Sequence, residues 1–317
     1  MTRQPALVLA LLALANAGCP RSETGGAADA APAASASAAK PADAGSPFAT
    51  IPVDRPDGGP LNAVGATPAE VTKYLNPSHL PPYSGPTGAV EGTLWVEGPP
   101  APETPGDFAR CPGAADLYGR KFREGKPNPA NAKQRALADV IVAVTGYSGF
   151  FIPEREENAR VAIEGCGFAK RTVTITFGQR LEVLNTTTEF WSPVLEPAPN
   201  AVIMMAPPKA KDPVRLYPKK PGIYRLVDHD RKFAVSDLYV LLQPLHGTTD
   251  KEGHYRIDGV PVGKLKVNAR HPSFDDETSQ DIEVQPNVVV KADLVLRYEP
   301  KDAGPPDEDA GYRPKLR

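Results

Sequence analysis

Aromatic residues and cysteine are sparse in this sequence of 317 residues, and neither sign of charge dominates it. Tyr, Phe and Trp make up 7% of the chain, charged residues 23%, and the formal net charge is −2. The part that can pack a core is therefore shorter than the length suggests. The chain also lacks the basic excess typical of nucleic-acid-binding domains, so we expect no nucleic-acid partner.

Proline and glycine are abundant instead. The 37 prolines and 27 glycines make about one residue in five, against about 12% in an average chain. This excess disfavours helical bundles and doubly wound folds. Prolines concentrate before residue 110 and after residue 299, which leaves residues 88–298 for one or two β domains.

The N-terminus predicts export. Arg3 precedes an apolar run at 6–15 that is too short to span a bilayer, so residues 1–18 are interpreted as a signal peptide. Residues 15–17 fit ordinary signal peptidase, whereas residues 17–19 resemble a bacterial lipobox in which Cys19 is acylated. Asn16 departs from the lipobox pattern, which usually has Leu there.

Cysteine parity favours the lipid anchor. The chain has three cysteines, so acylation of Cys19 leaves Cys111 and Cys166 as an even pair in an oxidising compartment. We expect these two to form a disulfide. The predicted location is the outer membrane or periplasmic face of the envelope, with attachment to the membrane through the lipid on Cys19. The alternative is a soluble secreted or periplasmic protein with an odd thiol.

Low-complexity sequence flanks the folded part. Residues 19–87 are rich in Ala, Ser and Pro and are expected to be a disordered tether, because they cannot bury enough apolar surface to offset the entropy of ordering. Residues 299–317 are expected to be a disordered tail. Within the tether, Thr67, Pro68 and Glu70 form a capping-box pattern that predicts a short helix at 68–75.

The remaining sequence alternates strand runs with turns and predicts an all-β fold of the sandwich type. Residues 172–177 alternate with period two, which indicates one buried face and one wet face. The other expected strands are 89–96, 137–144, 160–163, 180–184, 224–227, 238–242, 253–258, 264–270, 281–285 and 288–298.

The sequence resembles two protein families. The segments GCGF at 165–168, GQRLEVLNT at 178–186 and PGIY at 221–224 are similar to a cupredoxin-like module of the plastocyanin and azurin type. The run TDKEGHYRIDGVPVG at 249–263 resembles the carboxypeptidase regulatory-like domain, a transthyretin-like sandwich. Together they imply two β-sandwiches.

The order of the motifs raises the possibility of an insertion. Residues 91–98 and 137–146 fit the first strands of a regulatory-like domain, whose hairpin follows only at 248. In the nested arrangement, residues 88–146 and 244–298 form this sandwich, with a basic loop in the first part, and 147–243 form the cupredoxin-like module. Strands near 90 and 140 then pair with strands after 254. The alternative is a tandem in which 88–242 is an enlarged cupredoxin.

A blue-copper site needs two His, a Cys thiolate and usually a Met. Carried over from the cupredoxin pattern, these positions fall on Trp191, His229, Lys232 and Val235, and no cysteine follows Cys166. The resemblance therefore implies a scaffold without copper, and we expect no metal and no cofactor. Either Trp191 fills the ligand cavity, with Lys232 over its face in a cation–π contact or solvated nearby, or Trp191 is an ordinary core or rim aromatic and Lys232 lies on the surface.

No enzyme motif is complete. No His of the chain begins an H-x-x-E zinc pair, and Phe150 breaks a G-x-S-x-G elbow at 146–150. Residues 110–135 carry seven Lys or Arg and two acids, as a solvated loop or as a face toward an anionic membrane or polysaccharide. We expect a non-enzymatic envelope lipoprotein that binds a polysaccharide, peptide or protein. The alternative is a divergent periplasmic cupredoxin for electron transfer or metal handling.

Overall fold

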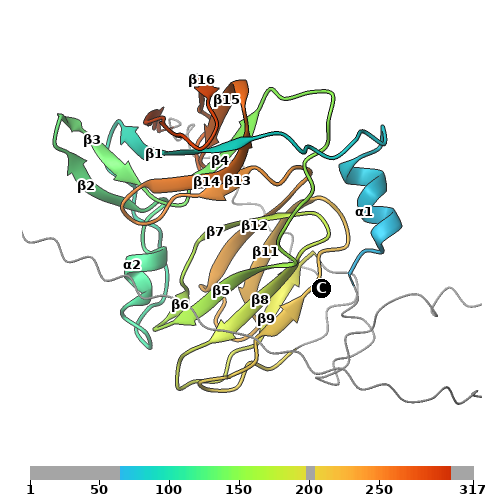
Figure 1. The fold of residues 1–317 in the computed structure, drawn as a ribbon. Helices are drawn as coiled ribbons and strands as arrows, with labels where there is room; N and C mark the ends of the chain where they lie inside the picture. Colours follow the sequence, from blue (N-terminus) through green and yellow to red (C-terminus); the bar gives the residue numbers. More distant parts are fainter. Residues whose placement is uncertain (1–64, 198–203, 301–317) are drawn as a thin grey trace, which may run out of the picture. The chain divides into compact units, whose positions relative to one another are not determined.

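The computed structural model describes residues 65–197 and 204–300. The predicted signal peptide, Cys19, most of the predicted tether and the tail from residue 301 lie outside these described residues. The described part consists mainly of strands, with the short helices α1 (Pro68–Leu75) and α2 (Ala114–Tyr118) (Figure 1). The predicted all-β class is confirmed.

The strands follow one another as β1 (Thr87–Glu97), β2 (Glu124–Asn128), β3 (Asn131–Leu137), β4 (Ile141–Thr145), β5 (Asn158–Glu164), β6 (Gly167–Phe168), β7 (Thr172–Thr176), β8 (Arg180–Asn185), β9 (Pro193–Glu196), β10 (Val214–Leu216), β11 (Gly222–Asp228), β12 (Val235–Leu241), β13 (His246–Thr248), β14 (His254–Pro261), β15 (Gly263–Arg270), β16 (Glu277–Val284), β17 (Val289–Lys291) and β18 (Leu294–Arg297).

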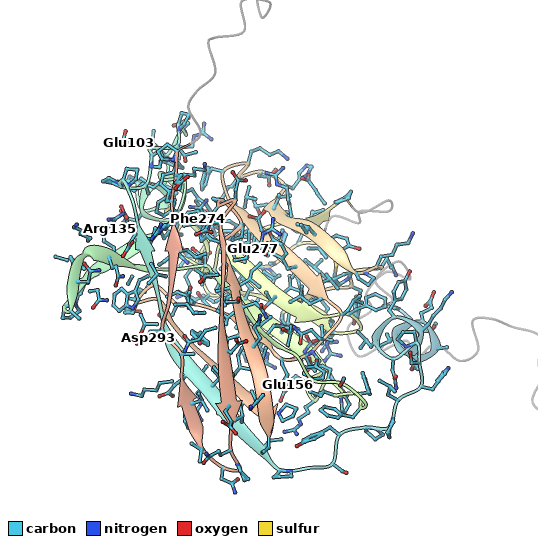
Figure 2. All side chains as sticks on the ribbon, turned by 90° about the horizontal axis from the view of Figure 1, so that it is seen from above. Glu103, Arg135, Glu156, Phe274, Glu277 and Asp293 are labelled. Atoms are coloured by element: carbon cyan, nitrogen blue, oxygen red, sulfur yellow. A yellow bond between two sulfur atoms is a disulfide. The ribbon has the colours of Figure 1, made fainter. Side chains whose placement is uncertain are left out.

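Strands from both ends of the described chain build one sandwich, here called the outer sandwich (β1–β4 and β13–β18). β1 pairs antiparallel with β14 and β3, and parallel with β17 and β18. The facing sheet has the order β13-β4-β15-β16. Pairing of β1 with β14 and of β4 with β15 is the pairing that the nested arrangement requires. Figure 2 shows these strands from above, with Arg135 on β3 and Glu277 on β16.

The intervening strands β5–β12 form a second sandwich, here called the inserted sandwich. Its sheets have the orders β10-β8-β5-β6 and β7-β12-β11-β9. Phe168, Phe177 and Trp191 are the largest fully buried side chains of its core, whereas Phe122 and Leu94 lie in the separate core of the outer sandwich. Each sandwich thus buries its own apolar face, as expected of two domains.

The predicted helix is present as α1. The Thr67 hydroxyl accepts from the backbone N–H of Glu70, and the Glu70 carboxylate accepts from the backbone N–H of Thr67. Tyr74 of α1 packs edge-on against Phe177, with ring centroids 5.1 Å apart. A Cβ at Gly178, where φ is +103°, would meet Val71 at 2.9 Å. The helix therefore packs against the inserted sandwich, and the missing side chain at Gly178 leaves room for Val71 of the helix.

Two predicted strands are divided in the structure. The run at 137–144 is split between β3 and β4 because Asp139 has a φ of +63° and its carboxylate is buried. The run at 288–298 is split into β17 and β18 around the buried Ala292. Both breaks follow from tertiary contacts that a period-two pattern does not contain.

The basic segment is not the loop that the sequence predicts, because β2 and β3 pair as a hairpin at the edge of the outer sandwich. The absence of an apolar run there hides the strands from pattern analysis. Several of its cations pair with other groups of the same chain. Arg123 pairs with Asp139, Arg135 pairs with Glu124, and the Lys121 ammonium lies 5.3 Å from the Tyr298 ring centroid.

The predicted disulfide between Cys111 and Cys166 is present, with Cα atoms 5.7 Å apart. It joins the segment before α2 to the turn between β5 and β6 of the inserted sandwich. Close by, the Tyr118 hydroxyl of α2 accepts from the backbone N–H of Phe168 at 3.0 Å, and burial raises the pKa of Tyr118 to about 12. No helix within the described residues is long and apolar enough to cross a membrane.

Candidate functional site

The four positions that resemble copper ligands lie at one end of the inserted sandwich. Trp191, just before β9, is 2% exposed. His229 and Lys232 come from the turn between β11 and β12, and Val235 is the first residue of β12. The turn meets the residue after Trp191 through a hydrogen bond from the His229 backbone N–H to the Ser192 carbonyl at 3.0 Å. His229 and Lys232 are exposed and Val235 is half-buried.

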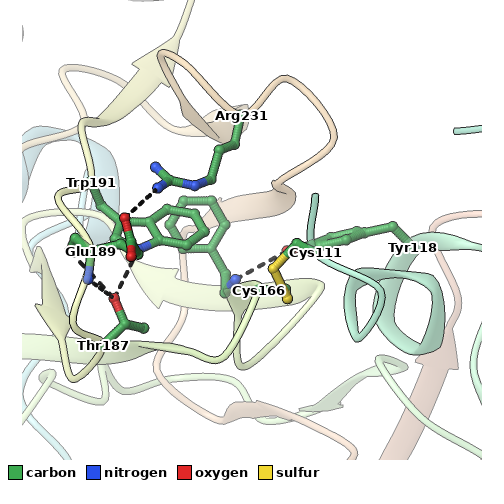
Figure 3. Close-up of a disulfide and its surroundings, with 8 residues drawn as sticks. Cys111, Tyr118, Cys166, Thr187, Glu189, Trp191 and Arg231 are labelled. Carbon is green, nitrogen blue, oxygen red and sulfur yellow. Dashed lines mark hydrogen bonds and ion pairs between the residues drawn. A yellow bond between two sulfur atoms is a disulfide. The ribbon is translucent and has the colours of Figure 1, made fainter. Parts of the chain in front are cut away.

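Arg231, not Lys232, lies over Trp191. The Arg231 guanidinium carbon is 4.3 Å from the ring centroid, a separation typical of a cation–π contact. On the other side, the Trp191 indole N–H donates to the Thr187 hydroxyl at 3.0 Å (Figure 3). Of the two interpretations of Trp191, the contact with Lys232 is therefore wrong, and Trp191 is a core residue covered by a neighbouring cation.

Asp228 explains which cation reaches the indole. Its fully buried carboxylate accepts from the backbone N–H groups of Ser192, Asp230 and Arg231 at 2.7, 3.2 and 2.8 Å. These hydrogen bonds stabilise the turn right after β11 and thereby fix the position of the Arg231 backbone. Lys232, one residue later, points into solvent.

The Arg231 side chain is held from three sides. It donates to the Phe190 carbonyl at 2.9 Å and forms an ion pair with Asp228 at 3.6 Å. A second ion pair joins it to Glu189 at 3.9 Å (Figure 3). Its side chain remains 26% exposed. A guanidinium fixed in this way loses little freedom when a further group approaches it.

Asn185 at the end of β8 supports the loops on which this site stands. Its buried side-chain amide donates to the carbonyls of Glu189, Ala206 and Pro207 at 2.7–2.9 Å. Its side-chain oxygen accepts from the backbone N–H and the hydroxyl of Thr187. The two loops on either side of Trp191 are thereby fixed to one buried residue.

Two large apolar side chains are exposed on the two loops beside Trp191. Phe190 and Met205 are each 56% exposed, and the Ser192 hydroxyl contacts the Met205 sulfur at 3.1 Å. We call Phe190, Met205 and Arg231 the Phe190 surface. Aromatic residues, Met and Arg are enriched in protein interfaces, so this composition is typical of a contact surface. Within the described residues, no three His, Cys, Asp or Glu side chains are grouped so that they could hold a metal ion.

The pattern DHDR at 228–231 was the only signal for Arg231 in the sequence, since an Asp often caps the turn that follows it. Phe190 and Met205 lie 15 residues apart in segments without strand periodicity. Sequence patterns alone did not bring them together. Cys166, the last cysteine of the chain, is held in the disulfide.

Residues 238–297 match the pattern of the carboxypeptidase regulatory-like domain family. This segment contains β13–β18 and is similar to that domain. No match is found among curated protein sequences.

Among solved structures, the chain is similar to amicyanin from Paracoccus versutus, with 16% identity, a TM-score of 0.25, and coverage of 28% of this chain and 85% of that chain. It is also similar to a copper-containing nitrite reductase from Thermus scotoductus, with 16% identity, a TM-score of 0.24, and coverage of 31% of this chain and 25% of that chain.

Proposed function

We propose that this chain is a non-enzymatic cell-envelope lipoprotein that binds a protein partner through the Phe190 surface. The observation that carries the proposal is the clamped Arg231, which donates to the Phe190 carbonyl, together with the exposed apolar side chains of Phe190 and Met205 on the two loops beside Trp191. A fixed guanidinium presents a charge at a defined position, and the flanking apolar groups supply area to be buried.

We test the docking with a photo-crosslinking amino acid in place of Phe190 in cells that produce the full chain. The same amino acid in place of Ile223, an apolar residue of β11 that is 62% exposed, is the matched control. The proposal expects a product of defined mass from position 190 that is absent from position 223. The product is expected to disappear when Arg231→Ala is added. Equal products from both positions, or no product from position 190, would refute it.

We propose further that this end of the inserted sandwich holds no blue-copper ion. The side chains of Trp191 and Val235 offer copper no suitable ligand atom, and Cys166, the last cysteine, is in a disulfide. Titration of the purified chain with Cu(II), followed by absorbance in the thiolate charge-transfer region and by metal analysis, tests this. Stoichiometric, tightly bound copper would instead support a divergent cupredoxin.

Attachment to the membrane is proposed to depend on a lipid on Cys19. Metabolic labelling with a clickable fatty acid is expected to label the full chain and to fail for Cys19→Ser. Detergent partition of the same two proteins supplies a second measurement. A wild-type chain that takes up no label and stays in the aqueous phase would show that the protein is soluble.

A further inference from the structure

A small pocket lies where the chain passes between the two sandwiches. Its volume is about 250 Å³, and its lining comes from three segments: the end of α1 and the residues after it, the outgoing crossing at 147–152, and the return at 242–244. The first segment is bonded to the second, because the backbone N–H of Tyr83 donates to the Phe151 carbonyl at 2.7 Å and that of Phe151 donates to the Pro81 carbonyl at 2.8 Å.

No charged residue lines this pocket, although 23% of the chain is charged. Its walls include Tyr147 and Phe150, whose rings stack with centroids 5.6 Å apart and an interplanar angle of 13°. Phe150 packs in turn on Tyr83 at 4.5 Å. The pocket therefore offers aromatic surface and gives a phosphate or carboxylate no counter-charge.

The pocket has few polar side chains, and a hydrogen bond fixes the orientation of two of them. The Tyr147 hydroxyl donates to the side-chain oxygen of Gln243 at 3.2 Å, and this bond turns the amide nitrogen of Gln243 away from Tyr147. Within the described residues that nitrogen has no hydrogen-bond partner. Ser78 adds a hydroxyl to the lining. A fitting ligand therefore carries hydroxyl or carbonyl oxygens as well as an apolar face.

The pocket is also preformed. Asn76 closes the loop after α1, since its amide donates to the Leu80 carbonyl at 2.9 Å and its oxygen accepts from the Leu80 backbone N–H at 2.8 Å. With the crossing segments bonded to each other, little ordering is needed when a ligand enters.

We propose that this pocket binds one uncharged sugar ring, such as a terminal or side-chain pyranose of a neutral polysaccharide. The C–H face of the ring lies on the aromatic wall, and ring hydroxyls bond to the Gln243 amide and the Ser78 hydroxyl. The volume is below the range of about 300–1,000 Å³ that accommodates drug-sized ligands, so it suits a single ring. This site is separate from the Phe190 surface and does not depend on the function proposed for that surface.

Saturation-transfer difference NMR on the full chain tests the proposal, with N-acetylglucosamine, galactose and maltotriose as neutral probes. Glucuronate is the charged ring of comparable size, and hexaproline represents the peptides that also bind aromatic grooves. We expect saturation transfer to the ring protons of at least one neutral probe, and weaker or no transfer to glucuronate.

Two variants locate the binding. Gln243→Leu removes the amide and is expected to weaken binding about tenfold, the equivalent of one directed hydrogen bond. Leu242→Glu puts a charge into the lining at a side chain that is 50% exposed, so the fold is expected to tolerate it while sugar binding is lost. Val288→Ala, at an exposed residue outside the pocket lining, is the matched control and is expected to bind as wild type.

Three results would overturn the assignment: no transfer to any neutral probe, binding that neither pocket variant weakens, or preferential binding of hexaproline. Circular dichroism and thermal unfolding of each variant separate loss of the site from loss of the fold. If Gln243→Leu fails to fold, Leu242→Glu still decides the outcome. Crosslinking from position 190 is unaffected by any of these results, so failure here and failure of the proposed docking are distinguishable.

Discussion

Asp139 joins the two sandwiches through its contact with the backbone of Arg171. Both carboxylate oxygens of Asp139 accept from the Arg123 guanidinium at 2.7 Å, and one also accepts from the backbone N–H of Arg171 at 3.1 Å. Arg123 lies just before β2 of the outer sandwich, and Arg171 lies just before β7 of the inserted sandwich. One buried carboxylate thus ties the two units together.

Asp139→Ala is therefore expected to lower the free energy of unfolding by about 3–5 kcal/mol, because it leaves a partly buried guanidinium without its partner. Urea unfolding followed by circular dichroism measures this. Asp139→Asn, which tolerates the positive φ at this position, separates the loss of charge from backbone strain and is expected to be milder. Glu277→Ala, which breaks the exposed pair with Arg270, is the control and is expected to change stability by less than about 1 kcal/mol. Equal effects of Asp139→Ala and Glu277→Ala would contradict the role of Asp139.

Reduction of the disulfide is expected to destabilise the fold by about 4 kcal/mol, because the bond closes a loop of 55 residues and limits the unfolded chain. The double variant Cys111→Ser, Cys166→Ser gives the same comparison without reductant. Cys19→Ser is the control and should leave the unfolding midpoint unchanged. A midpoint that does not respond to the double variant would mean that the bridge adds nothing to stability.

Arg231→Met is expected to cost about 1–2 kcal/mol, since the cation–π contact is lost and the buried Asp228 keeps fewer partners. In a Trp95→Phe background, where Trp191 is the only tryptophan, its emission should move to longer wavelength as water reaches the ring. Lys232→Met is the matched control one residue away and should change neither quantity. A spectral change in the Lys232 variant instead would favour the contact that the sequence suggested.

Stability should fall on mild acidification because of His246 and His271. Burial lowers the pKa of each to about 4, from an unfolded value of 6.5. The stability that the two neutral histidines contribute to the free energy of unfolding is fully present above pH 6.5. It is lost as the pH falls toward 4, because the unfolded chain then binds protons that the folded chain does not. At pH 5 the loss is about 2 kcal/mol per histidine.

His246 bridges the sandwiches, its ring nitrogens lying 3.0 and 3.1 Å from the hydroxyls of Thr174 and Thr176 on β7. Thr176 in turn donates to Glu154. His246→Gln should about halve the loss of stability between pH 7.5 and pH 5, measured by urea unfolding at each pH. His229→Gln, at an exposed position, should leave that loss unchanged. Identical pH dependence in wild type and His246→Gln would rule out this origin.

Local patterns in the sequence were sufficient to predict much of the fold. The capping box at Thr67 and the paired cysteines each describe short-range chemistry, and each appears in the structure. The run at 172–177 forms the strand β7, but the wet face predicted for it is wrong: both faces are covered, because Thr174 and Thr176 meet His246 of the outer sandwich. The motif order left a nested and a tandem arrangement open, and the pairs of β1 with β14 and of β4 with β15 are those that the nested one requires.

What the sequence did not predict depends on contacts between segments far apart in the chain. The positive φ of Asp139 arises where Arg123 and Arg171 meet its carboxylate, and no local pattern encodes that meeting. Likewise, Arg231 covers Trp191 because Asp228 sets the turn, so counting positions along a copper-ligand pattern selected the wrong cation.

The central position of β1 has a consequence for how the chain folds. β1 opens the outer sandwich, yet it pairs with β18 some 200 residues later, Leu94 opposite Leu294. The inserted sandwich is continuous in sequence from β5 to β12, so it can fold as soon as this segment of the chain has been synthesised. The outer sandwich must wait for its last strands, because a loop of such length closes slowly. During synthesis, the inserted sandwich is thus expected to form first, while β1 stays unpaired until the C-terminal strands arrive.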